Sequence, residues 1–151
     1  MTTTAGAAWG ALVLRVVLGV ILVMHAYEQV FLLGLRDLER TVVRHGFPGA
    51  VAPPVVWYSV AAEAIGGILL IVGLWTRGAA VMNLPVLFGS FFLLHLPQGF
   101  YMRGAVREAE RAAAIGYELS LMVLACTIAI AMIGPGSFSI DDRRRTFGRR
   151  R

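Results

Sequence analysis

Four long apolar stretches separated by shorter polar connections dominate the chain. They cover residues 9–33, 55–75, 79–96 and 112–133. Each is close to the roughly 20 apolar residues that a helix needs to cross the hydrocarbon core of a bilayer. Because Arg77 and Gly78 leave room only for a tight turn, the second and third helices must run antiparallel. The pattern predicts an all-α fold, a four-transmembrane-helix antiparallel bundle.

The two longer connections carry residues at helical spacing. In the first, over residues 35–49, Leu35, Leu38 and Val42 fall on one helical face. This spacing predicts a short amphipathic helix lying on the membrane surface. The second, over residues 98–116, places arginines at four-residue steps, which predicts another short helix anchored to lipid headgroups. These arginines are Arg103, Arg107 and Arg111.

Composition agrees with a membrane protein of one domain. Hydrophobic residues make up 58% of the 151 residues, against about 45–50% in an ordinary soluble domain. We expect a membrane domain over residues 1–140 and a basic tail over 141–151. All the basic side chains other than histidine are arginines, which flank the spans and form no groove with aromatics, so nucleic acid is excluded as a partner. The single cysteine, Cys126, excludes an intrachain disulfide and a CxxC redox motif.

Charge also predicts the orientation in the membrane. The tail DDRRRTFGRRR and Arg77 lie on the same side as the N-terminus if there are four spans. Positive charge favours the cytoplasmic side. The N-terminal residues lack the basic segment of a signal peptide, so we expect the first apolar stretch to be retained. These features predict a multi-pass protein of the cell (inner) membrane with both termini in the cytoplasm.

Ionisable residues inside the predicted spans are the candidates for function. Glu63 lies in an apolar run with no other charge, and a carboxylate at that depth is costly to insert. Gly66-Gly67 follows it and allows a neighbouring helix to come close. Other polar groups fall near the same membrane level, and Arg15 lies deeper towards the cytoplasm. The groups at that level are His25, Glu28, Glu63, His95 and Glu118.

Three chemistries suit these residue types. His25 and Glu28 are three residues apart and share a helix face. Facing carboxylates from other helices, they have the composition of a metal site, a proton relay or a quinone headgroup site. The alternative is structural: such groups pair across helices as packing contacts, and Arg15 reaches the interface with its long side chain. We predict no metal ligands.

Several segments resemble the DoxX family over nearly the whole chain. They are LRVVLGVILVMHAYEQVF, AAEAIGGILLIVGLWTRGAA, HLPQGFYMRG and YELSLMVLACTIAIAMIGPGSFSIDD. The resemblance implies a four-helix membrane protein, with relatives that include a subunit of an archaeal thiosulfate:quinone oxidoreductase and mycobacterial partners in superoxide defence and thiol handling. It matches Arg15, His25, Glu63, His95 and Glu118 to the family's polar positions. The chain departs from the family at HAYEQV, where many members have a glycine and later a lysine.

These features lead to three functional hypotheses. The first is a membrane subunit of a quinone- or thiol-linked redox complex, which leaves open whether the chain itself is an enzyme. Glu63 and Glu118 would exchange protons there, His25 and His95 would bind a quinone headgroup, and Arg15 and Glu28 would be further cofactor-binding residues. The second is a scaffold that recruits oxidoreductases or other enzymes to the lipid bilayer. The third is a proton-coupled transporter of small solutes, which four short helices would form only as a homo-oligomer.

Overall fold

The computed structural model describes residues 5–101 and 116–143, and this part of the chain consists of helices and turns without a strand. The all-α prediction is confirmed for these residues. The elements, in chain order, are α1 (Ala5–Tyr27), the π-helical segment η1 (Glu28–Leu33), α2 (Leu35–Arg44), α3 (Ala52–Val72), α4 (Thr76–Gly89), the π-helical segment η2 (Ser90–His95), the 3-10 turn η3 (Leu96–Gln98) and α5 (Glu118–Ile133).

Three helical stretches of the described chain are long and apolar enough to cross a membrane. They are Ala5–Leu33, Ala52–Val72 and Thr76–Gln98. A fourth, α5, is apolar and 16 residues long. The predicted start of the fourth span, at residues 112–115, lies outside the described residues. The chain is therefore a multi-pass membrane protein, and a fourth crossing stays a prediction.

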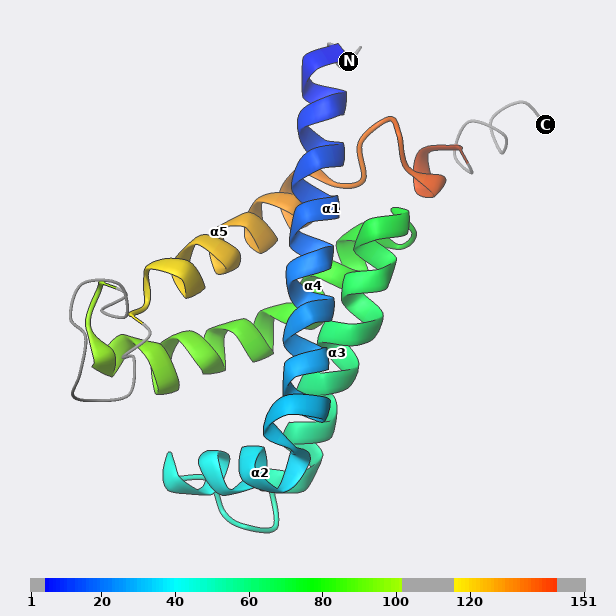
Figure 1. Cartoon of the computed structure of the whole chain (residues 1–151). Helices are drawn as coiled ribbons and strands as arrows, with labels where there is room; N and C mark the ends of the chain where they lie inside the picture. The colour runs from blue at the N-terminus through cyan, green and yellow to red at the C-terminus, as the bar shows by residue number, and fades with distance from the viewer. Residues whose placement is uncertain (1–4, 102–115, 144–151) are drawn as a thin grey trace.

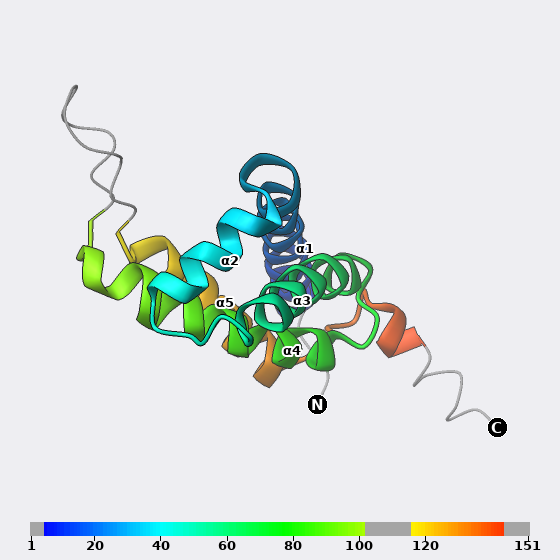
Figure 2. The same cartoon turned by 90° about the horizontal axis from the view of Figure 1, so that it is seen from below.

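The long helices are arranged as two pairs (Figures 1 and 2). In both views α1 lies beside α3, while α4 and α5 lie beside each other and extend away to one side. The arrangement thus differs from the predicted bundle, in which all four axes run roughly together. The turn from α3 to α4 explains the change of direction, because Gly73 (φ 73°) and Trp75 (φ 49°) both adopt left-handed backbone conformations.

The backbones of α1 and α3 touch where two glycines face each other. A Cβ added to Gly19 would lie 2.6 Å from the Gly67 carbonyl oxygen, and one added to Gly67 would lie 2.8 Å from that of Gly19. Only glycine permits such an approach. The neighbouring Gly66 is covered by the Asn83 side chain from α4. The prediction that Gly66-Gly67 allows close packing is confirmed.

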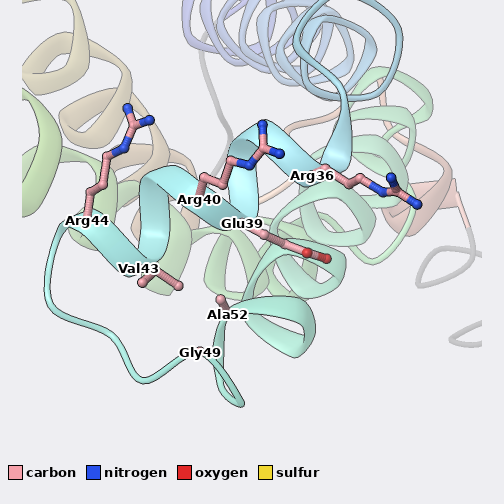
Figure 3. A pocket seen from close by; sticks show the side chains of 7 residues that line it. All are labelled: Arg36, Glu39, Arg40, Val43, Arg44, Gly49 and Ala52. Carbon is pink, nitrogen blue, oxygen red and sulfur yellow. The ribbon is translucent and has the colours of Figure 1, made fainter.

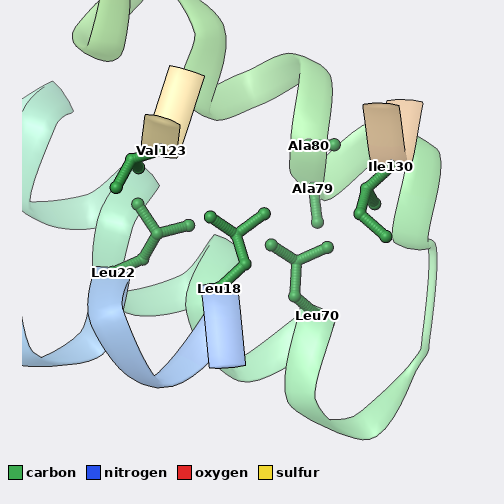
Figure 4. Packing of buried hydrophobic residues seen from close by; sticks show 7 residues of the cluster. All are labelled: Leu18, Leu22, Leu70, Ala79, Ala80, Val123 and Ile130. Atoms are coloured by element: carbon green, nitrogen blue, oxygen red, sulfur yellow. The ribbon is translucent and has the colours of Figure 1, made fainter. Parts of the chain in front are cut away.

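Apolar side chains from all four long helices meet where the two pairs join (Figure 4). Leu18 of α1 approaches Leu70 of α3, Leu22 lies near Val123 of α5, and the small residues of α4 let these larger side chains come close. Because lipid tails are as apolar as leucine, close packing rather than water exclusion holds such a core together. The buried cluster consists of Leu18, Leu22, Leu70, Ala79, Ala80, Val123 and Ile130.

The structure describes the first of the two longer connections completely, but only the ends of the second. The first contains α2, which runs across the ends of α1 and α3 (Figure 1). Its location at a membrane surface stays a prediction. The helix predicted around Arg103, Arg107 and Arg111 lies outside the described residues, as does the tail beyond residue 143.

The segment after α5 folds back against the turn between α3 and α4. Asp141 Oδ1 accepts the backbone N–H of Trp75 at 2.8 Å, and Oδ2 accepts that of Thr76 at 2.9 Å. The Asp141 N–H donates to the Gly73 carbonyl at 3.1 Å. Asp141 therefore supplies from a distant part of the sequence the cap that the first turn of α4 needs. Although the predicted tail begins at 141, this residue is bonded to the membrane domain.

Replacing Asp141 with alanine is expected to destabilise the protein by about 1–2 kcal/mol, the typical cost of a lost helix cap. The backbone N–H groups of Trp75 and Thr76 would lose their acceptor. Thermal unfolding of the purified protein in detergent measures the effect. Asp37→Ala is the matched control, because Asp37 is exposed and contacts only its own helix and the neighbouring Arg40. Equal midpoints for the two variants would contradict the capping role.

Candidate functional site

Glu63 lies one residue past the middle of α3, which runs from Ala52 to Val72. Only 4% of Glu63 is exposed. Its Oε2 accepts a hydrogen bond of 2.6 Å from Nε2 of Gln29, which lies in η1. The Ser59 Oγ, one turn earlier on α3, lies 3.3 Å from Oε1 of the same glutamine. A buried carboxyl group is thus paired with a neutral amide between the first two spans.

The π-helical segment η1 brings Gln29 to this place. An α-helix that continued beyond Tyr27 would turn each later side chain by a fixed angle, whereas a π-helix has more residues per turn and re-aims them. The Gly34 N–H donates to the Gln29 carbonyl at 3.1 Å and closes the segment. The apolar pattern gave no sign of this segment.

His25 and Glu28 do not join the buried pair through hydrogen bonds. His25 is exposed, and its Nδ1 lies 2.8 Å from the Ile21 carbonyl of its own helix. Glu28 is also exposed, but lies within electrostatic range of Glu63. The end of the first span therefore presents a histidine and a carboxylate outwards, while Gln29 turns inwards.

His95 and Glu118 lie at the far ends of the other pair of helices. His95 is the last residue of η2 and is half-buried, and its Nδ1 has no hydrogen-bond partner within the described residues. Glu118 begins α5, where its backbone N–H donates to the Phe100 carbonyl at 3.2 Å. Glu118 is half-buried and takes part in a further interaction. No group of three or more histidine, cysteine or acidic residues suited to a metal ion occurs in residues 5–101 and 116–143.

Arg15 lies near the middle of α1, which runs from Ala5 to Tyr27, and is 2% exposed. Its two terminal nitrogens donate to backbone carbonyls beyond α5, Nη1 to Pro135 at 2.9 Å and Nη2 to Phe138 at 2.5 Å. The guanidinium packs against Gly73, where a Cβ would lie 2.2 Å from Nη1. Asp141 lies within electrostatic range of it. These contacts are structural: Arg15 holds the segment after α5 against α1.

Comparison with protein families agrees with this helical architecture. A family model described as DoxX matches residues 10–96, more than half of the chain. The chain belongs to the DoxX family. It is also similar to an uncharacterized protein of Haemophilus influenzae, with 27% identity over 131 residues that cover 86% of this chain and 87% of the relative. No solved structure matches.

The family match covers the paired Gln29 and Glu63 as well as Arg15, but ends before Asp141. Sequence reasoning selected Glu63 in this DoxX protein because of its depth, and missed Gln29 as its partner. The only sequence feature that pointed to Gln29 was the departure from the family at HAYEQV, and it did not indicate a contact with Glu63. Asp141 was missed because a cap from another segment leaves no local pattern.

Proposed function

We propose that this DoxX family protein is the membrane subunit of a quinone- or thiol-linked redox complex, with Glu63 as its proton-exchanging group. The observation that carries the proposal is the pairing of a carboxyl group with Gln29 in the middle of a candidate membrane span. An amide can donate to a carboxylate through its nitrogen and accept from a carboxylic acid through its oxygen. The pair therefore suits both protonation states, which a proton-exchanging group requires.

The other polar groups lie apart from one another near the ends of the helices, and this supports a subunit that works with a partner protein. His25 and Glu28 are exposed near the end of the first span, where they are open to another polypeptide. In the redox complex His25 would contact the quinone headgroup at this surface, with Glu28, which lies within electrostatic range of Glu63, on the same part of the chain. His95 and Glu118 would act at the far end of the α4–α5 pair, and Arg15 is assigned to structure rather than to the cofactor.

Replacing Glu63 with glutamine is expected to lower the amount of quinone that stays with the protein by about tenfold or more. Removing one partner of a buried hydrogen bond costs about 1–3 kcal/mol, and each 1.4 kcal/mol is a factor of ten in affinity. Native mass spectrometry of the protein extracted gently from its own membrane measures bound quinone directly. Glu39→Gln, the same chemical change on α2 outside the spans, should retain it.

Three results of this experiment are informative. Loss of quinone in Glu63→Gln alone supports the redox site. Equal quinone in wild type and both variants contradicts it. A wild-type protein that carries another polypeptide but no quinone favours the scaffold hypothesis, with the Glu63–Gln29 contact then serving to pack α1 against α3.

A further inference from the structure

A row of arginines on α2 occupies a shallow depression at the end of the first two spans. Arg36, Arg40 and Arg44 line it together with one acidic residue, Glu39, and with Val43, Gly49 and Ala52. Figure 3 shows the arginine side chains projecting from α2, while Val43 is turned towards Ala52. Residues four apart advance about 6 Å along a helix and stay on one face. The three arginines therefore follow one side of α2, and with one carboxyl group, that of Glu39, among them the depression has more positive than negative side chains.

The charges around this depression are only partly balanced. Arg40 binds Asp37 at 2.7 Å, and both side chains are largely exposed. Within the part of the chain that the structure describes, Arg36 and Arg44 make no ion pair. Arg36 and Arg44, which make no ion pair, thus flank Arg40, whose ion pair with Asp37 is weak because both side chains are exposed to solvent. An incoming anion can compete with Asp37 for Arg40.

The location of α2 indicates where that anion comes from. The first span ends at Leu33, and Gly34 (φ 83°) turns the chain directly into α2. Phe31 and Leu32, just before the turn, are each 70% exposed. Apolar side chains this exposed at the end of a span face lipid chains, so the arginines that follow lie at headgroup level. Figure 1 shows α2 crosswise to α1, as an interfacial helix would lie.

We propose that Arg36, Arg40 and Arg44 bind the headgroup phosphate of an anionic phospholipid. Arginine is suited to this because its planar fork donates two parallel hydrogen bonds to phosphate oxygens. Zwitterionic lipids carry the same phosphate, but their amine or choline is repelled by the adjacent arginines. The acyl chains then lie against the exposed side chains of Phe31 and Leu32. The site is independent of the Glu63–Gln29 pair and does not rest on the proposed redox function.

The test is a competition between lipids on the full-length protein in detergent. Phosphatidylglycerol and phosphatidylcholine are added in equal amounts, and native mass spectrometry gives the ratio of the two bound species. Wild type is expected to retain phosphatidylglycerol at least fivefold over phosphatidylcholine. The triple variant Arg36→Gln, Arg40→Gln, Arg44→Gln should bring the ratio to about one, because the positive charge that favours an anionic headgroup is then gone. Asp37→Asn, which frees Arg40, should raise it.

Two controls distinguish lipid binding at this site from nonspecific electrostatic attraction between the lipid and the protein. Arg149→Gln, Arg150→Gln, Arg151→Gln removes the same charge from the tail and should leave the ratio as in wild type. The variant Arg36→Lys, Arg40→Lys, Arg44→Lys keeps the charge and should keep part of the preference. An unchanged ratio in the α2 glutamine variant, or an equal loss in the tail variant, overturns the proposal. So does displacement of phosphatidylglycerol by inorganic phosphate at the same concentration, since a lipid also holds on by its acyl chains.

Discussion

A Gly67→Val variant is expected to lose most of the stability of the pairing between α1 and α3. At this crossing an added Cβ would lie 2.8 Å from the Gly19 carbonyl oxygen and 3.0 Å from the Val23 nitrogen. Both atoms belong to the backbone, so no side-chain rotation relieves the overlap, and the helices must move apart. Overpacking costs about 1–3 kcal/mol and occasionally more, and we expect the upper end, about 3 kcal/mol, because two further methyl groups follow the Cβ.

Thermal unfolding in detergent measures this loss, and Gly10→Val is the matched control. Gly10 lies in α1, away from the crossing with α3, and a Cβ there meets nothing within 4 Å. The control should unfold close to the wild-type midpoint, since only intrinsic helix propensity changes. If Gly67→Val unfolds at the same temperature as Gly10→Val, α1 and α3 do not cross at these glycines.

The same crossing sets the geometry of the candidate site. Glu63 lies one turn before Gly67 on α3, and its partner Gln29 extends from the end of α1. Helices that separate at the glycines also separate this donor and acceptor. Gly67→Val should therefore lower quinone retention because it moves Gln29 away from Glu63, whereas Glu63→Gln should lower it without separating the two helices. Measured together with thermal stability, the two variants distinguish loss of the Glu63–Gln29 contact from loss of the Glu63 carboxyl group.

The sequence could predict what depends on local pattern. Long apolar stretches indicated helices of membrane length, and three are found in the described residues. Gly66-Gly67 indicated close packing because a missing side chain matters whatever the neighbour is. Glu63 was selected because the free-energy cost of inserting a carboxyl group depends on its depth in the membrane, and this depth can be estimated by counting residues along the chain.

What the sequence could not predict depends on rotation and on distant contacts. A helix that is apolar on every side has no periodic stripe to show which face is buried. The π-helical segment that turns Gln29 towards Glu63 has no sequence signature in such a run. The tilt of α4 and α5 away from α1 depends on the left-handed conformation of Trp75, which the turn sequence does not require. The structural role of Arg15 involves carbonyls 120 and 123 residues away.

Replacing Arg15 with leucine is expected to destabilise the protein by about 3–5 kcal/mol, because it removes two hydrogen bonds donated by a buried charged group, and such bonds contribute about 1.5–3 kcal/mol each. The carbonyls of Pro135 and Phe138 would lose their donors, and Asp141 would lose the nearby positive charge. Thermal unfolding in detergent measures the loss of stability. Limited proteolysis should also show earlier cleavage in the segment after α5, because that segment would detach from α1.

Arg15→Lys separates this structural contact from a charge that merely reaches the interface. A lysine keeps the charge but has a single nitrogen, which cannot bridge two carbonyls in the fixed fork geometry of arginine. We therefore expect Arg15→Lys to lie between wild type and Arg15→Leu in stability. Arg143→Gln, a change at an exposed arginine, should behave as wild type. If the lysine variant is as stable as wild type, the charge alone matters and Arg15 serves as an interfacial anchor.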